Sequence, residues 1–334
     1  MQKKSPQHVA IVGASGAVGQ EMLDVLARRR FPVASLRLLG SERSAGQTMT
    51  FADETLIVER LGPDSFRGVD VALFSAGGGV SKEYAPRAVA AGAVVVDNSS
   101  AFRLDPDVPL VVPPVNGADV RGHQGIVANP NCTTAVTLMA LAPLHEAFGV
   151  RRVFASSYQA VSGTGARAIV ELRQQVEALA AGREATPEIY PHQIAFNVLP
   201  QVDVFLDSGY TKEEMKMQGE GRRILHLPDF RASVTCVRVP VYRAHSVAVS
   251  AEFTRPVSLE KAREVLAAAP GLRVVDEPAQ SRYPMPLFCA GKDDCEVGRL
   301  RLDCALDNGL AFWVSGDQLL RGAALNAVEI AELL

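Results

Sequence analysis

The chain contains 334 residues, of which 48% are hydrophobic and 21% are charged, and its formal net charge is -3. Such a chain is long and apolar enough for two folded domains, which excludes an intrinsically disordered protein. The weak net charge argues against a general attraction to nucleic acid or to an anionic membrane, and no apolar run is long enough to span a bilayer. The five cysteines form no Cys-x-x-Cys pair and no zinc-type spacing with histidine, so we expect no metal site and a reducing, cytoplasmic compartment.

The first strong pattern is a glycine-rich loop near the N-terminus. A short apolar run at residues 8–12 leads into Gly13-Ala14-Ser15-Gly16-Ala17-Val18-Gly19, and a helical pattern follows over residues 20–29. A strand, a glycine-rich turn and a helix form the context of a dinucleotide site, because glycines let the backbone approach a pyrophosphate at the helix N-terminus. The spacing is G-x-x-G-x-x-G, and the alternative is a plain tight turn. We predict that residues 13–18 bind a nicotinamide dinucleotide.

The end of the second predicted strand, residues 35–39, bears on the choice of cofactor. It lacks the acidic residue that would bind an NAD ribose, and Ser41, Glu42 and Arg43 follow it. A hydroxyl and a guanidinium can hold a 2′-phosphate, which favours NADP. The negative charge of Glu42 argues against a bound phosphate. The alternative for Arg43 is that it is an ordinary charged residue of a surface loop.

The following segments predict a doubly wound α/β domain. Residues 69–75 form a near-continuous apolar run, a helix is expected over 83–91, and residues 93–97 repeat the strand pattern. Ligands of such sheets gather beyond the carboxyl ends of the strands. We therefore place Ser75, Ala76 and Gly77 at the cofactor, and Arg103 at a candidate anion site.

The second half of the chain changes character, with longer segments of alternating polarity at 153–158, 233–241, 246–253 and 300–306. This pattern favours an α+β catalytic and dimerisation domain with a mixed or antiparallel sheet, one face of which packs on helices or on a partner. We predict a cofactor domain over 1–131 and a catalytic domain over 132–315. A C-terminal helix over 316–334 would pack back onto the first domain, and its leading residue Gln318 would touch the cofactor.

A cysteine stands at the predicted domain boundary, in Asn129-Pro130-Asn131-Cys132-Thr133-Thr134, just before a helical run. The N-terminus of a helix lowers a thiol pKa and favours the nucleophilic thiolate. The alternative is a buried structural cysteine. Beside a dinucleotide domain, such a thiol predicts hydride transfer through a thioester. Of six histidines that compete as its partner, His245 lies between two strong strands.

These motifs together resemble bacterial aspartate-β-semialdehyde dehydrogenases over essentially the whole chain. The resemblance depends on the glycine loop, the cysteine motif and five further stretches: Arg43-Ser44-Ala45-Gly46, Leu73-Phe74-Ser75-Ala76-Gly77-Gly78, Asp97-Asn98-Ser99-Ser100-Ala101-Phe102-Arg103, Tyr158-Gln159-Ala160-Val161-Ser162-Gly163-Thr164-Gly165 and Gly322-Ala323-Ala324-Leu325-Asn326-Ala327. It implies the NADP-dependent, reversible conversion of L-aspartyl-4-phosphate into L-aspartate-4-semialdehyde and phosphate. That reaction is a step toward lysine, methionine and threonine, and the family forms homodimers or homotetramers.

The resemblance also implies roles for individual residues. Cys132 would be the nucleophile and acyl carrier, Gln159 would orient the acyl group, and His245 would be the acid/base. The substrate-binding residues would be Arg238 for the α-carboxylate, Glu213 for the ammonium, Arg103 and Lys216 for the phosphate, and Asn131 beside the cysteine. Ser162 and Gly163 would join Gln318 at the cofactor.

Two departures from the family pattern are Pro114, where the family usually has Glu, and Gln318, which follows Asp317 in place of the usual Asn. Gln318 keeps an amide but carries it on a longer arm. Two other functions stay open: a related phosphorylating dehydrogenase of the N-acetyl-glutamyl phosphate or glyceraldehyde phosphate type, and a catalytically silent nucleotide-binding homologue. An N-acetylated substrate would have no ammonium and no need for Glu213.

Overall fold

The computed structural model describes residues 5–334, which separate into two compact units. Unit 1 comprises the chain up to Asn131 together with Ala323–Leu334, and unit 2 comprises Cys132–Gly322. The C-terminal helix is shorter than the segment expected from the sequence. Strand β13 runs to Gly316, a π-helical turn occupies Leu320–Ala324, and helix α9 is Leu325–Leu333.

Unit 1 is built on a seven-stranded sheet in the order β3-β4-β2-β1-β5-β6-β7, in which only the β3–β4 pair is antiparallel. Its strands are β1 Gln7–Val12, β2 Val33–Gly40, β3 Thr48–Phe51, β4 Glu54–Arg60, β5 Val71–Phe74, β6 Val94–Asp97 and β7 Ile126–Ala128. Residues 9–12 of β1 and all of β5 are apolar and buried because a parallel sheet is covered on both faces. The doubly wound fold predicted for this region is confirmed.

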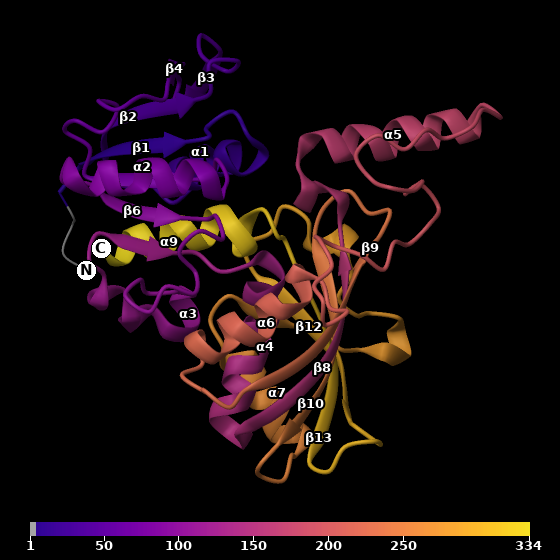
Figure 1. Ribbon diagram of the computed structural model, residues 1–334. Coiled ribbons are helices and arrows are strands. Elements are labelled where there is room, and N and C mark those ends of the chain that lie inside the picture. The colour runs from indigo at the N-terminus through magenta and orange to yellow at the C-terminus, as the bar shows by residue number, and fades with distance from the viewer. Residues whose placement is uncertain (1–4) are drawn as a thin grey trace. The chain divides into compact units, whose positions relative to one another are not determined.

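The helices of unit 1 pack onto this sheet or onto one another, and the last of them comes from the far end of the chain (Figure 1). They are α1 Ala17–Arg28, α2 Gly78–Ala90, α3 Pro113–Asn116 with a 3₁₀ turn at Gly117–Gly122, and α9. Helix α9 contacts α1, β5 and β6, and Arg29, just after α1, pairs with Glu329 and Glu332. The C-terminal segment therefore completes the core of unit 1.

Unit 2 contains a mixed six-stranded sheet in the order β11-β12-β13-β10-β8-β9. Its strands are β8 Val150–Gln159, β9 Arg231–Arg238, β10 His245–Phe253, β11 Leu272–Val274, β12 Cys295–Leu302 and β13 Gly309–Gly316. The mixed sheet is as predicted, but the strand expected over 300–306 begins five residues earlier. Its alternation is hidden because the register shifts between Gly298 and Arg301, where Arg299 has a φ of 55°.

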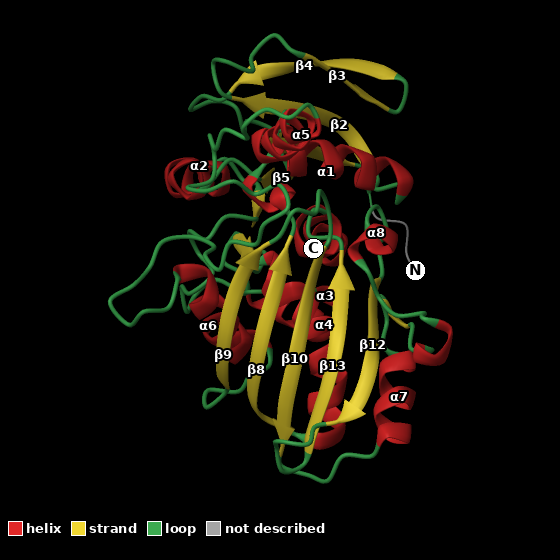
Figure 2. Ribbon diagram, turned by 90° about the vertical axis from the view of Figure 1, so that its right-hand side faces the viewer, coloured by secondary structure: helices red, strands yellow, loops and turns green. Residues whose placement is uncertain are grey.

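Helices α4 Cys132–Phe148, α6 Lys212–Ile224 and α7 Leu259–Ala268 cover one face of this sheet (Figure 2). Helix α4 is buried along most of its length because it packs on the sheet and is in contact with both of the other helices. The remaining elements are α5 Ala166–Ala180, α8 Pro286–Cys289 and 3₁₀ turns at Val161–Thr164 and Pro278–Gln280. Across residues 5–334 no helix has the length and hydropathy that a bilayer span needs.

Candidate active site

The glycine-rich loop of unit 1 joins β1 to α1 and lies close to the end of β5. Gly13 has a φ of 85°, and a Cβ there would clash with the carbonyl oxygen of Ser75. A Cβ on Gly19 would clash with the Gly13 carbonyl. Helix α1 begins after Gly16 with no side-chain cap, so no side chain of the cap residue competes for its first N–H groups. These features fit a pyrophosphate held by backbone N–H groups.

The segment after β2 presents polar side chains to solvent. The Ser41 hydroxyl lies 3.3 Å from that of Ser44, and the Glu42 carboxylate lies 3.6 Å from the Arg60 guanidinium. Arg43 is exposed and makes no hydrogen bond or ion pair with any of residues 5–334. Its guanidinium is thus available to an anion, whereas Glu42 is partly neutralised.

A second loop of unit 1 follows β6 and is fixed by the buried carboxylate of Asp97. This carboxylate accepts hydrogen bonds from the hydroxyls of Ser81 and Ser99, each at 2.6 Å, and from the Ser99 backbone. Arg103 closes the loop by donating to the carbonyls of Asn98 at 2.7 Å and Asn129 at 2.9 Å. The Arg103 guanidinium is therefore held at the carboxyl ends of β6 and β7, where ligands of such sheets bind.

Cys132 is the first residue of α4 and is partly exposed. A Cβ on Gly322 would lie 2.5 Å from the Cys132 Cβ, so only glycine fits against this side of the cysteine. The thiols of Cys236 and Cys295 differ sharply from it. They are buried, and burial raises the pKa of each to about 12, which makes them poor nucleophiles.

Gln159, the last residue of β8, connects the start of α4 to helix α6. Its amide nitrogen donates to the Thr133 hydroxyl at 2.7 Å and to the Glu213 carboxylate at 3.0 Å. Both amide hydrogens are thereby used within the protein. In this state Gln159 orients the residue next to Cys132 and the carboxylate of Glu213.

Glu213 and Lys216 lie within the first two turns of α6, which begins with a capping box between Thr211 and Glu214. The Lys216 ammonium lies 2.7 Å from Glu213 and 3.2 Å from Asp203. Burial alone would lower the pKa of Lys216, but the two carboxylates outweigh it and the pKa is raised. The lysine therefore keeps its charge while largely withdrawn from solvent.

Ala160 orients two further side chains through its backbone. Its carbonyl accepts a hydrogen bond from Nη1 of Arg238 at 2.7 Å, and its N–H donates to Nδ1 of His245 at 3.0 Å. Two atoms are left buried without a partner among the described residues: Nε of Arg238 and Nε2 of His245. A Cβ on Gly163 would lie 3.0 Å from Nη1 of Arg238 and 3.2 Å from Nε2 of His245, so both side chains converge beside this glycine.

The contact from Ala160 determines which nitrogen of His245 carries the proton. Because Nδ1 accepts a hydrogen bond, the neutral ring holds its proton on Nε2. Burial, and then the positive charge of Arg238, lower the pKa of His245 to about 3. At neutral pH this histidine is thus a neutral hydrogen-bond donor in the structure.

Unit 2 contains nine of the residues that the sequence singled out: Cys132, Gln159, Ser162, Gly163, Glu213, Lys216, Arg238, His245 and Gln318. Gln318 is buried, and its amide bonds within the unit, donating to the Ser162 hydroxyl and accepting from the Ala244 N–H. The other predicted residues belong to unit 1, including Asn131, which directly precedes Cys132.

Comparisons with known proteins agree with this arrangement. Residues 8–123 match the family model described as semialdehyde dehydrogenase, NAD binding domain, and residues 141–321 match the one described as semialdehyde dehydrogenase, dimerisation domain. The chain is 52% identical to aspartate-semialdehyde dehydrogenase of Aquifex aeolicus, covering 98% of this chain and 97% of that protein. The chain belongs to the aspartate-semialdehyde dehydrogenase family. The resemblance seen in the sequence is confirmed, and the chain is an oxidoreductase.

Further members of the family show the same fold and length. The Bacillus subtilis enzyme is 50% identical over 98% of this chain and 97% of its own. A crystal structure of aspartate semialdehyde dehydrogenase II from Vibrio cholerae, complexed with ASA, superposes with a TM-score of 0.95 at 43% identity, over 99% and 98% of the two chains. The enzyme of Candida albicans, solved with NADP, gives a TM-score of 0.77 at 26% identity over the same shares.

Some residues that shape this family site were not singled out from the sequence. Thr133 and Asp97 lie inside motifs named in the sequence analysis, but the sequence does not show which groups their side chains hydrogen-bond. Tyr190, whose ring centre lies 5.9 Å from the Arg238 guanidinium carbon, falls in a loop with no motif at all. Only the folded chain shows these contacts.

Proposed function

We propose that this chain catalyses the reversible, NADP-dependent reductive dephosphorylation of L-aspartyl-4-phosphate to L-aspartate-4-semialdehyde and phosphate. The observation that supports this function best is a pair of buried atoms beside Gly163, Nε of Arg238 and Nε2 of His245, which have no partner within residues 5–334 and lie in the unit that also holds Cys132. A buried guanidinium with an unused N–H calls for an anionic ligand, and a substrate carboxylate supplies one.

The charges of the site match the charges of this substrate. Arg238 would bind the α-carboxylate, Glu213 would receive the ammonium, and Arg103 and Lys216 would bind the phosphate. Glu213 is the residue that separates this substrate from an N-acetylated one, because a buried carboxylate favours a ligand with a positive charge. Lys216 keeps its charge between two carboxylates and is therefore competent to bind a departing phosphate.

In the reductive direction the Cys132 thiolate attacks the acyl carbon, the bond between that carbon and the phosphate oxygen breaks, and phosphate leaves with the electron pair. When bound, the nicotinamide cofactor supplies the hydride that the thioester carbon accepts. The oxygen of the resulting tetrahedral adduct then carries a negative charge. This adduct collapses by expelling the thiolate, which releases the aldehyde and regenerates Cys132.

His245 would act on that oxygen. Its Nε2–H is unpartnered and preorganised by the Ala160 contact, so it can donate to the tetrahedral oxyanion without prior rearrangement. The collapse needs no added proton, since the thiolate leaves as an anion. A neutral imidazole that stabilises an oxyanion is a known catalytic device. We therefore assign His245 to hydrogen-bond donation in place of proton uptake.

NADP is the proposed cofactor. Its pyrophosphate would bind residues 13–18, and its 2′-phosphate would bind Ser41 and the unpaired guanidinium of Arg43. The partial neutralisation of Glu42 by Arg60 removes part of the charge that would oppose this phosphate. The NADP in the Candida albicans structure supports the same choice.

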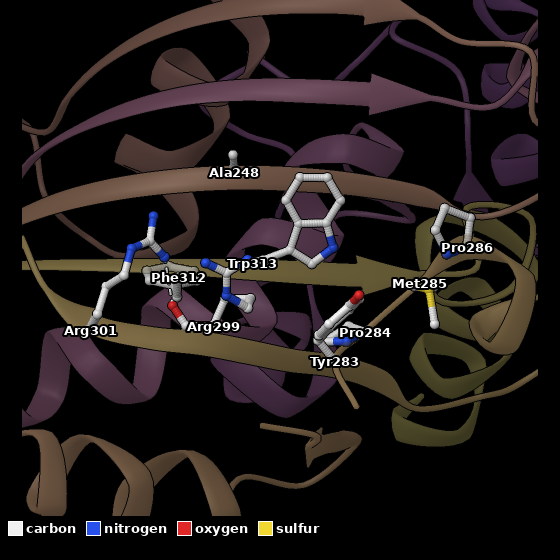
Figure 3. Close-up of a pocket in the computed structure, with 9 residues that line it drawn as sticks. All are labelled: Ala248, Tyr283, Pro284, Met285, Pro286, Arg299, Arg301, Phe312 and Trp313. Atoms are coloured by element: carbon white, nitrogen blue, oxygen red, sulfur yellow. Dashed lines mark hydrogen bonds between the residues drawn. The ribbon is translucent and has the colours of Figure 1, made fainter. Parts of the chain in front are cut away.

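We further propose that a second copy of the chain covers the open face of the unit 2 sheet. No helix of the described chain crosses this face in Figure 2, and its strands present Phe154 and Tyr158, which are 45% and 37% exposed. Tyr158 packs against Trp313, which lines a hollow with Met285 and Arg299 among others (Figure 3). Exposed aromatic clusters of this kind mark protein interfaces. Sedimentation of a Trp313→Glu variant tests this proposal, because an unchanged oligomer would contradict it.

The function is tested by following NADPH formation from aspartate semialdehyde with and without inorganic phosphate. NAD, N-acetylglutamate semialdehyde and glyceraldehyde phosphate serve as controls in the same assay. Cys132→Ser should lower turnover by several orders of magnitude while NADPH still binds. A phosphate-independent signal, no signal, or near-normal turnover of the variant would contradict the proposal.

A further inference from the structure

The turn that carries His245 into the site is held in an unfavourable backbone conformation. His245 is the first residue of β10, and Ala244 before it has a φ of 72°, in the left-handed region that favours glycine. An alanine persists there only when surrounding contacts fix it. The contacts that hold this turn therefore influence where the imidazole lies.

Two adjacent residues after β13 make those contacts. The Ala244 N–H donates to Oε1 of Gln318 at 2.8 Å, and Nε of Arg243 donates to the Asp317 carboxylate at 2.5 Å. Asp317 is fully buried and also accepts from the Gly291 backbone at 2.6 Å. The turn is thus hydrogen-bonded to Asp317 and Gln318, and Asp317 is itself held by the Gly291 backbone.

The other end of the Gln318 amide reaches the second segment that positions His245. Its nitrogen donates to the Ser162 hydroxyl at 2.5 Å, two residues after Ala160, whose N–H holds Nδ1 of His245. One amide therefore bridges the segment that bears the imidazole and the segment that fixes its rotation and tautomer. The amide thereby uses its oxygen and one of its two N–H groups within the protein, and its second N–H is the donor that a cofactor contact would use.

We propose that Gln318 is a positioning residue for His245, which it serves by bridging Ala244 and Ser162. The inference rests on the proposed function, in which the Nε2–H of His245 donates to the tetrahedral oxyanion. Without the bridge the turn would relax from the left-handed conformation, and that hydrogen bond would be misaligned.

The test compares Gln318→Met, which keeps the length of the side chain but removes both hydrogen bonds, with Gln318→Glu, which keeps the acceptor for the Ala244 N–H. Gln318→Met should lower kcat by about 10- to 100-fold, as expected for misplacement of a catalytic group. The KM for aspartate semialdehyde and the Kd for NADPH should each stay within about 2-fold, because no contact to either ligand is lost. Gln318→Glu should recover a large part of kcat.

Gln218→Met is a matched control, because Oε1 of Gln218 also accepts a backbone N–H, that of Ala232, at the opposite end of β9 from Arg238. This control should leave kcat unchanged. Ala244→Gly should lower kcat through added freedom of the turn, while the midpoint of thermal unfolding stays equal or rises because glycine relieves the strained φ. If Gln318→Met does not fold, Gln318→Glu and Ala244→Gly still decide the question.

A measurement that needs no catalytic turnover distinguishes a failure of this inference from a failure of the proposed function. In ¹⁵N spectra of histidine-labelled protein, wild type should show His245 with its proton on Nε2, and Gln318→Met should shift or broaden that signal. Unchanged kcat and an unchanged His245 signal in Gln318→Met would overturn the proposal. A weakened NADPH affinity with normal kcat at saturating NADPH would also overturn it, because Gln318 would then be a cofactor contact.

Discussion

Protonation of His245 should destabilise unit 2 as the pH falls. The folded ring is neutral because its pKa lies at about 3, whereas the unfolded ring has a pKa of about 6.5. Below that value the unfolded chain takes up a proton that the folded chain does not. The contribution of His245 to stability is therefore complete above about pH 6.5 and decreases as the pH falls toward 3.

Between about pH 6.5 and pH 3 the size of this loss in unfolding free energy depends only on the pKa of the unfolded ring, because the folded ring stays neutral. Each pH unit below about 6.5 costs roughly 1.4 kcal/mol, so lowering the pH from 7 to 5 should reduce the free energy of unfolding by about 2 kcal/mol through this residue alone. The charged groups nearest the ring act in opposite directions: Arg238 lowers its pKa and Glu213 raises it. Burial exceeds both effects, which is why the ring stays neutral.

The assay is urea unfolding of wild type and of His245→Gln, each at pH 7 and pH 5. The protein has a single tryptophan, Trp313, which lies in unit 2 with His245, so its fluorescence follows the unfolding of that unit. Titrations common to both proteins cancel, and wild type should lose about 2 kcal/mol more than the variant. Equal losses, or an imidazolium signal of His245 at pH 6 in ¹⁵N spectra, would refute the reasoning.

Two other substitutions test the geometry of the site. Gly163→Ala should lower kcat/KM for aspartate semialdehyde by about 10-fold, because its Cβ would meet Arg238 at 3.0 Å and His245 at 3.2 Å and shift them slightly; normal kinetics would show that the space beside this glycine is not used. Thr133→Val should lower the free energy of unfolding by about 1 to 3 kcal/mol, because it leaves an amide hydrogen of Gln159 without its partner, and chemical denaturation that gives no loss would contradict this.

The sequence predicts the fold well wherever one local rule governs a segment. The glycine loop follows β1 and begins α1 as expected. Glycines are needed there both for the turn of the chain and for its close approach to neighbouring backbone, and the same residues precede the start of the helix. The parallel strands are recognisable by their unbroken apolar runs. Strand β12 is displaced from its prediction because a bulge at Arg299 breaks the alternation on which the prediction depends.

The site is less predictable because its contacts join residues far apart in the chain. Cys132 and His245 could be named from their motifs, but the proton position on His245 depends on a backbone N–H that lies 85 residues away at Ala160. Gln318 likewise accepts a hydrogen bond from the N–H of Ala244, which lies 74 residues before it in the chain. A motif shows which side chains are present, and only the fold shows which of their atoms are already occupied.

Residues 159–163, which comprise the last residue of β8 and the turn after it, hold several functional side chains in place. Gln159 binds through its side chain, Ala160 through both backbone groups, and Ser162 through its hydroxyl, while Gly163 leaves the space beside them open. Each of these contacts leads to a different segment of unit 2. A shift of this one turn would therefore move the guanidinium, the imidazole and the start of α4 together. Substitutions within it should consequently be far from additive, which double-mutant cycles between Gly163 and Gln159 would measure.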